Sequence, residues 1–263
     1  MRGAWARVGD RLWRAVVVTV GSGAVVTQRD LRVLSFAVEQ FGLPMPLVAE
    51  LVSRLAADTP SPTTAERVAR RLAARLEAGH YIRRVVVAGE TWMVPTEAGL
   101  ALGMAEDQET PYEVWKPAGW KLAHVATVAR LRLHLEDRHP GAAWESERQI
   151  RRRWHNSGAR VRRWDGGLHF PGGQAVGIEV ELHIKRASLY EGIVRDQDPT
   201  WNAVSWFTPI AQVRLLQQRL QAAGAGGHHE VTAVPEGVAP CPPRLPRHRA
   251  GGPPPRRDPP GSP

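Results

Sequence analysis

Residues 161–185, with the sequence VRRWDGGLHFPGGQAVGIEVELHIK, constrain the fold more than any other segment of the chain. The run Pro-Gly-Gly-Gln at 171–174 predicts a reversal between two strands, because glycine supplies the positive φ angles that a tight turn needs. In the second strand apolar residues occupy positions 176, 178, 180 and 182, and Glu179 and Glu181 lie between them. Such an alternation places both glutamates on the face opposite the apolar side chains. The segment therefore predicts a hairpin with two neighbouring carboxylates on one face.

The register of this hairpin decides whether Asp165 joins Glu179 and Glu181. A two- or four-residue turn would pair Asp165 with Val180, on the other face. A three-residue turn, or a bulge at residues 166–167, would place it opposite Glu179 or Glu181, and two adjacent glycines inside a strand favour the bulge. We predict the convergent arrangement, which gathers carboxylates that must be exposed, paired or bound to a metal. A strand with ordinary solvent-facing charge is the alternative.

Composition limits the class of protein less than the high net charge suggests. The 263 residues, 43% of them hydrophobic, suffice for one large domain or two modest ones. The formal net charge is +9, but it is spread over the core and both ends, so clusters of charge must carry any case for nucleic acid. Cys241 is the single cysteine, which excludes a disulfide within the chain and is consistent with a reducing cytoplasm.

The two ends of the chain are expected to lie outside the folded domains. Residues 1–24 combine arginines with the apolar run 15–20, but Gly-Ser-Gly at 21–23 interrupts this run, and it is too short to cross a bilayer. We interpret residues 1–24 as an N-terminal extension and expect no membrane partner. Residues 224–263 are rich in proline and arginine, which predicts a disordered tail.

Residues 25–104 have the order of elements of a winged helix-turn-helix domain. Apolar periodicity predicts helices at 27–42, 45–57 and 63–79, the first capped by Thr27 and the third by a capping box of Thr63 and Glu66. A hairpin over 81–94, with its turn at Ala88 and Gly89, then forms the wing, and a short helix follows Pro95. In such domains the third helix reads the major groove of duplex DNA and the wing touches the backbone.

Arginines follow the two elements of this domain that would meet DNA. Their side chains suit phosphate contacts, although a solvated face is the alternative in so arginine-rich a chain. The candidate DNA-binding residues are Arg67, Arg70, Arg71 and Arg75 on the third helix and Arg83 and Arg84 at the start of the wing.

After a linker at 105–120, residues 121–223 predict an α/β sandwich with the order helix, strand, hairpin, helix, strand, helix. Arg151, Arg152 and Arg153 lie between two tryptophans, a combination that suits a phosphate backbone and unstacked bases. The alternative is that these arginines neutralise the neighbouring carboxylates. His124 and His134 on the first helix are left out of the site, because lone histidines on a helix are more often packed or solvated.

A winged helix followed by LAHVATVARLRL, WESERQIR, an Asp-led strand and IEVELHIK resembles the plasmid replication-relaxation family of actinobacteria, over roughly residues 25–222. The second half also resembles the PD-(D/E)xK nuclease fold, which has a core of the order α-β-β-β-α-β. Together these resemblances imply an α+β protein: an N-terminal winged helix-turn-helix domain followed by an α/β restriction-endonuclease-like domain.

The resemblance also implies roles for single residues. Asp165 matches the motif aspartate and Glu179 the acidic member of E-x-K, whereas Trp164 and Glu181 stand where proline and lysine are usual. The implied metal is Mg²⁺ or Mn²⁺, held by the first two carboxylates and by Glu181 as a further ligand or base. Lys185 would stabilise developing negative charge, and Glu147, with Glu145 as the alternative, would supply an additional acid.

The implied function is DNA binding in plasmid replication or DNA relaxation, with a metal-dependent DNA-nicking site. Duplex DNA and plasmid replication or transfer proteins would be its partners. The alternative is a non-enzymatic DNA-binding replication accessory or regulator whose nuclease-like domain is degenerate.

Overall fold

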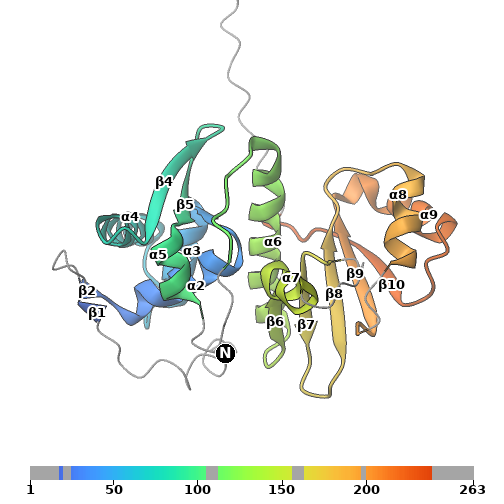
Figure 1. Cartoon of the computed structure of the whole chain (residues 1–263), viewed down its shortest axis with the longest axis horizontal. Coiled ribbons are helices and arrows are strands. Elements are labelled where there is room, and N and C mark those ends of the chain that lie inside the picture. The colour runs from blue at the N-terminus through green and yellow to red at the C-terminus, as the bar shows by residue number, and fades with distance from the viewer. Residues whose placement is uncertain (1–17, 20–24, 105–111, 156–162, 197–199, 239–263) are drawn as a thin grey trace, which may run out of the picture.

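The computed structural model describes residues 18–19, 25–104, 112–155, 163–196 and 200–238. The fold is mixed α+β, with a small and a large sheet on opposite sides of one central helix (Figure 1). Among the described residues no helix is both long and apolar enough to cross a membrane.

The helices of the N-terminal half are α2 (Gln28–Glu39), α3 (Met45–Arg54), α4 (Pro62–Ala78) and α5 (Glu97–Gly103). Thr27 is the N-cap residue of helix α2, as predicted, and Asp30 completes a capping box with it. The hydroxyl of Thr27 accepts a hydrogen bond from the backbone nitrogen of Asp30 at 3.2 Å, and the Asp30 carboxylate accepts one from the backbone nitrogen of Thr27 at 3.0 Å. This reciprocal pair satisfies two donors that the first turn of a helix leaves without an intrahelical partner.

The predicted capping box at the start of α4 is wrong. Ser61 is the N-cap residue, and its hydroxyl accepts a hydrogen bond from the backbone nitrogen of Thr64 at 3.3 Å. Pro62 then occupies the first helical position, where its fixed φ fits the helix and its missing N–H costs no hydrogen bond. Serine followed by proline is thus the stronger start signal, and Thr63 lies inside the helix rather than before it.

The small sheet has the order β3-β5-β4 and is antiparallel, with β3 at Leu43–Pro44, β4 at Ile82–Val87 and β5 at Glu90–Pro95. Strands β4 and β5 form the predicted hairpin. Its two turn residues, Ala88 and Gly89, have φ angles of 52° and 79°, as a two-residue hairpin turn requires. A separate antiparallel pair joins β1 (Val18–Thr19) to β2 (Val25–Val26).

Helix α6 (Gly119–Arg138) lies between the two halves of the molecule (Figure 1). Ala129 and Leu133 pack into the core of the N-terminal half, whereas Leu131 and Leu135 pack against the large sheet. The sequence predicts the first of these faces but not the second. Because α6 is buried on two sides, it joins the two halves through continuous apolar packing.

The large sheet has the order β10-β9-β8-β7-β6. Its strands are β6 (Ala143–Ser146), β7 (Gly166–His169), β8 (Ala175–Val180), β9 (Ala203–Thr208) and β10 (His229–Ala233). Strands β6, β7 and β8 form an antiparallel meander, and β9 and β10 add in parallel. The other elements are α7 (Glu147–His155), α8 (Ala187–Arg195), the 3₁₀-helix η1 (Ile210–Gln212) and α9 (Val213–Ala222).

Two helical layers cover this sheet. Helix α6 packs on one face, and α8 and α9 pack on the other through a core that includes Tyr190, Trp206 and Leu216 (Figure 1). This arrangement is an α/β sandwich.

The expectation that ordered structure ends near residue 223 is wrong. Strand β10 pairs in parallel with all of β9, from His229 opposite Val204 to Ala233 opposite Thr208. Trp206 donates a hydrogen bond from Nε1 to Nδ1 of His229 at 3.0 Å. Burial lowers the pKa of His229 to about 4, so this histidine is neutral and can accept the bond. The rest of the predicted tail, residues 239–263, lies outside the described residues, as do residues 1–17 and 20–24 of the predicted N-terminal extension.

Glycines in the hairpin make room for tryptophan rings. A Cβ atom on Gly166 would lie 2.1 Å from the ring of Trp144, and one on Gly167 would lie 2.1 Å from the ring of Trp201. Both glycines pair regularly with β8, opposite Ile178 and Gly177. The predicted bulge at residues 166–167 is therefore wrong: these glycines serve close ring packing and do not interrupt the strand.

Candidate functional site

The hairpin register brings Asp165 to the position across from Glu179. His169 pairs with Ala175, and the next residue, Phe170, donates a backbone hydrogen bond to Gln174 at 2.8 Å. The loop thus has three residues, which is one of the two arrangements predicted to bring Asp165 to the same face as Glu179 and Glu181. Continuing the register from Gly166 opposite Ile178 places Asp165 across from Glu179.

Both carboxylate oxygens of Asp165 have partners in the protein. Oδ1 lies 3.0 Å from Nε2 of His124 on α6, and Oδ2 accepts a hydrogen bond from the backbone nitrogen of Val180 at 2.8 Å. The second bond takes the place of a backbone ladder bond just where β7 begins. Asp165 therefore links the start of β7 to the end of β8 and to α6 through these two contacts.

Glu179 and Glu181 are buried and share one ammonium group. Their side chains are 2% and 5% exposed, and Nζ of Lys185 lies 3.8 Å from Oε1 of Glu179 and also pairs with Oε2 of Glu181. Lys185 reaches them from beyond the end of β8, where its backbone nitrogen donates a hydrogen bond to the hydroxyl of Tyr190 at 3.0 Å. Burial and the neighbouring carboxylates of Glu181 and Glu179 raise the pKa of Tyr190 to about 12. The glutamates are thus paired inside the protein rather than exposed.

Glu147 joins the acidic group from the first position of α7. It forms an ion pair with Arg151, one turn along the same helix. Burial and the neighbouring Asp165 carboxylate raise the pKa of Glu147. Glu147 and Asp165 also line the same small cavity.

His124 is the site residue that sequence reasoning misses. Burial alone would lower its pKa, but the carboxylates of Asp165, Glu179 and Glu147 outweigh burial and raise that pKa to about 9. The ring is therefore an imidazolium at neutral pH. No local pattern distinguishes this histidine, because its partners lie on β7, β8 and α7, well beyond it in the chain.

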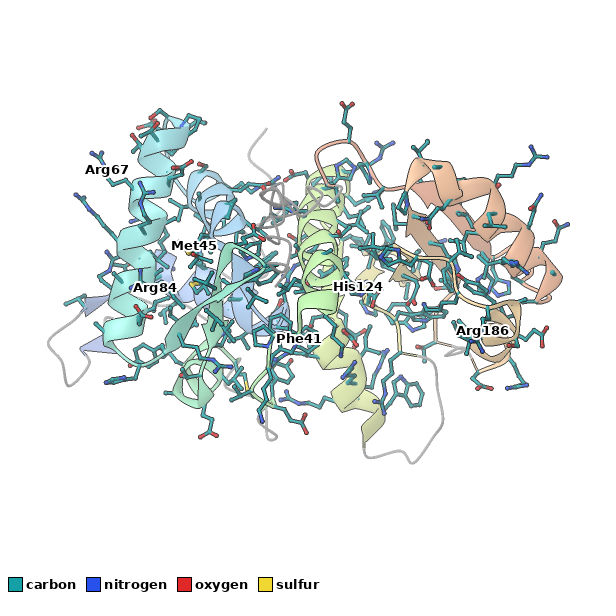
Figure 2. The ribbon with its side chains drawn as sticks, turned by 90° about the horizontal axis from the view of Figure 1, so that it is seen from above. Phe41, Met45, Arg67, Arg84, His124 and Arg186 are labelled. Carbon is teal, nitrogen blue, oxygen red and sulfur yellow. The ribbon has the colours of Figure 1, made fainter. Side chains whose placement is uncertain are left out.

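The end of α2 closes this acidic site from the N-terminal half. Glu39, Gln40 and Phe41 line a cavity of only about 10 Å³ together with His124 and other residues of the site. Figure 2 places Phe41 and His124 at the centre of the molecule, where the two halves meet. A space of this size holds one water molecule at most.

Two buried arginines hold the end of α2 in this place. Arg132 of α6 pairs with Glu39 and with Glu136, and the guanidinium of Arg148 lies 4.4 Å from the ring centroid of Phe41. Burial lowers the pKa of Arg148 to about 10. The cover over the acidic site is thus part of the packing between the two halves.

The predicted arginines of α4 divide into two groups. Arg67, Arg70 and Arg71 are exposed on the outer side of the helix, and Arg67 projects into solvent in Figure 2. Arg75, one turn beyond Arg71, is only partly exposed: its Nη2 lies 2.7 Å from Oδ1 of Asp30, which is completely buried. This ion pair ties α4 to α2 and gives Arg75 a structural role that its prediction as a DNA-binding residue does not include.

The wing arginines are exposed and also have partners. Arg84 donates a hydrogen bond from Nε to Oε2 of Glu77 at 2.7 Å, and Arg83 donates one from Nη2 to the carbonyl oxygen of Trp115 at 3.3 Å. Both contacts position the guanidinium groups beside α4 and at the base of the hairpin. The pairs lie at the surface, where an anion can compete for the arginines.

The arginines of α7 are occupied by nearby groups. Arg151 pairs with Glu147, Arg153 lies 3.5 Å from the carboxylate of Glu145, and the guanidinium of Arg152 lies 4.4 Å from the ring centroid of Tyr112. These contacts favour the alternative that the α7 arginines neutralise neighbouring carboxylates.

Comparison of the chain with protein-family models, with curated proteins and with solved structures gives no match.

Proposed function

We propose that the chain binds duplex DNA through α4 and the β4–β5 hairpin. The observation that carries this proposal is the outer side of α4, where Arg67, Arg70 and Arg71 are exposed at a spacing of three and four residues. Residues at this spacing share one face of a helix. Such a face presents three guanidinium groups in the geometry of a recognition helix that contacts phosphates and base edges.

The surrounding elements support the same assignment. Helices α2, α3 and α4 precede the β4–β5 hairpin, and β3 adds a third strand to it, which is the order of a winged helix-turn-helix domain. The exposed side chains of Arg83 and Arg84 lie on the first strand of the hairpin. If α4 lay in the major groove of a duplex, the phosphate backbone of the DNA would lie near that strand.

Replacing Arg67 and Arg71 together with alanine is expected to weaken duplex binding about a hundredfold or more, because charge-assisted bonds to phosphate contribute about 1.5 kcal/mol or more each. The slope of log affinity against log salt concentration should fall by about 1.8, since each lost phosphate contact removes about 0.9. Fluorescence anisotropy of a labelled mixed-sequence duplex at several salt concentrations measures both quantities.

The matched control is the pair Arg214→Ala and Arg219→Ala on α9, where both arginines are exposed and the net charge changes equally. This control should keep the affinity and the slope of the unchanged chain. Equal losses in the two double variants would mean that binding follows net charge alone, and no loss in the α4 variant would contradict the assignment of α4.

For the second half we propose a nuclease-like architecture. Helix α6, the meander β6-β7-β8, helix α8 and the parallel strand β9 follow one another in the order of the PD-(D/E)xK core, with α7 inserted after β6. Asp165 immediately precedes the second of these strands, and Glu179 lies within the third. These positions support the resemblance in architecture.

The carboxylates as arranged do not fit a divalent cation. His124 and the nitrogen of Val180 occupy the two oxygens of Asp165, and Lys185 lies between Glu179 and Glu181. Among the residues that the structure describes, no three His, Cys, Asp or Glu side chains form a group that could hold a metal ion. A cation site needs several converging oxygens, and here two protein cations already neutralise them.

We therefore propose a DNA-binding accessory of plasmid replication or DNA relaxation in which the nuclease-like site is degenerate. The internal pairing of the acidic group favours this function over metal-dependent nicking. The site's cover by Glu39, Gln40 and Phe41 supports the same choice, because a phosphodiester has no room beside Asp165.

Mg²⁺ or Mn²⁺ is expected to leave the melting temperature unchanged and to induce no nicking of supercoiled plasmid. A genuine site would stabilise the folded chain by about 2.7 kcal/mol at a hundred times its Kd. Differential scanning fluorimetry and agarose-gel nicking assays, with Ca²⁺ as the cation control, measure the two effects. Metal-dependent nicking that disappears in Asp165→Asn, with duplex affinity retained, would instead establish an endonuclease.

A further inference from the structure

A cavity of about 770 Å³ lies in the N-terminal half, between α3, the start of α4 and the β4–β5 hairpin. Met45 and Ala49 of α3, Pro60 of the connecting loop and Ala65 of α4 supply apolar walls. Figure 2 shows Met45 and Arg84 on this side of the molecule, well apart from His124 and the acidic site. The volume falls within the range of about 300–1,000 Å³ that is typical of sites for small organic molecules.

The charged groups of the lining have partners of opposite charge. Arg70 lies 3.8 Å from Glu66, and Arg84 is bonded to Glu77 just outside the cavity. Glu50 is likewise paired with an arginine, one turn along α3, at 3.0 Å. The lining thus holds two glutamates and two arginines, so it carries no net charge that would favour a charged ligand over an uncharged one.

The uncharged polar groups of the lining are hydroxyls. Ser53, Thr59 and Thr91 enter the wall from α3, from the loop that follows it and from β5. Hydroxyls can donate hydrogen bonds to carbonyl, ether or hydroxyl oxygens of a ligand. Apolar walls with a few such groups select an apolar molecule that carries a few oxygen atoms.

We propose that this cavity is a binding site for an uncharged, largely apolar organic molecule with oxygen acceptors, and that its occupancy weakens duplex binding. The second clause rests on the proposed function. Arg70 belongs both to the cavity wall and to the exposed side of α4, and Arg84 joins the wall to the hairpin. A ligand that packs against both side chains holds them over the cavity and away from phosphates.

The site is tested first without DNA, with prodan as the probe, an uncharged naphthalene fluorophore that carries a ketone oxygen. Saturable fluorescence enhancement at one probe per chain is expected. Ser53→Trp and Thr59→Trp, which place an indole in the cavity, should each raise the probe Kd at least tenfold. Ala101→Trp on the exposed side of α5 is the matched control and should bind the probe normally.

Thr59 is exposed in a loop, so its variant keeps the test informative if Ser53→Trp fails to fold. Enhancement that does not saturate, or that persists unchanged in a folded cavity variant, overturns the site. This result is independent of DNA binding, so it is distinguishable from a failure of the proposed function.

The coupling is tested by duplex titration with and without saturating probe. A severalfold loss of duplex affinity in the unchanged chain and in Ala101→Trp, but not in Thr59→Trp, is expected. Reciprocity requires that saturating duplex weakens probe binding by the same factor. Saturable probe binding with unchanged duplex affinity overturns the coupling and leaves only the site.

Discussion

Asp30→Ala is expected to lower the free energy of unfolding by about 2–4 kcal/mol, the combined cost of losing charge-assisted hydrogen bonds to a partly exposed arginine and one bond of a helix cap. Asp30 is completely buried, and its carboxylate accepts hydrogen bonds from Arg75 at 2.7, 3.0 and 3.3 Å. The same carboxylate closes the capping box with the backbone nitrogen of Thr27 at 3.0 Å. The substitution therefore removes the carboxylate half of the capping box of α2 and the tie between α2 and α4 together.

Urea unfolding followed by circular dichroism measures this loss. Asp58→Ala is the matched control, because Asp58 is exposed in the loop after α3, and its substitution should change stability by about 0.5 kcal/mol or less. A loss below about 1 kcal/mol for Asp30→Ala would mean that water replaces the carboxylate at little cost. In that case Arg75 would remain among the candidate DNA-binding residues.

Local signals predict the N-terminal half well. The capping box of Thr27 and Asp30 and the turn at Ala88 and Gly89 each depend on residues within a few positions of one another. The start of α4 shows the limit of such signals, since Ser61 and Thr63 both resemble an N-cap, and only the structure places Pro62 at the first helical position.

The large sheet is predictable in its order but not in its extent. Strand β10 has an alternating pattern over only five residues, next to a proline-rich segment, and it gains its stability from parallel pairing with β9. Parallel strands are joined by a long connection rather than by a tight turn, so the sequence contains no turn motif from which the pairing could be predicted. The bulge predicted at residues 166–167 is wrong for a similar reason. The two glycines make room for the rings of Trp144 and Trp201, which are distant in sequence.

The acidic residues of the site were predictable, whereas the cations that neutralise them were only partly so. Spacing along one hairpin relates Asp165, Glu179 and Glu181, because a strand has a fixed period. Lys185 lies four residues after Glu181, but it contacts the glutamates from a segment beyond the end of β8, where the strand period no longer applies. His124 comes from α6, and only tertiary packing brings its ring to Asp165. A sequence pattern thus locates the charge and leaves its partners undetermined.

Lys185→Met is expected to destabilise the chain by about 3 kcal/mol, near the lower end of the cost of removing one partner from a buried ion pair. Glu179 and Glu181 are 2% and 5% exposed, and both lie beside the ammonium group of Lys185. Methionine keeps most of the side-chain volume, so the change removes the charge more than the packing. The two carboxylates, two residues apart at the end of β8, then repel each other in a site that excludes water.

The double variant Lys185→Met with Glu181→Gln tests this cause directly. It removes one of the two repelling charges and should recover about half or more of the lost stability, because a neutral amide costs less to bury than a carboxylate. Lys116→Met, at an exposed position, is the matched control and should stay within about 0.5 kcal/mol of the unchanged chain. If Mg²⁺ restored the stability of Lys185→Met, the two glutamates would be able to accept a metal once the internal cation is gone. Recovery by Glu181→Gln without any effect of Mg²⁺ would mean that Lys185 neutralises the two glutamates permanently. The ammonium group would then take the place that a metal ion has in an active nuclease site.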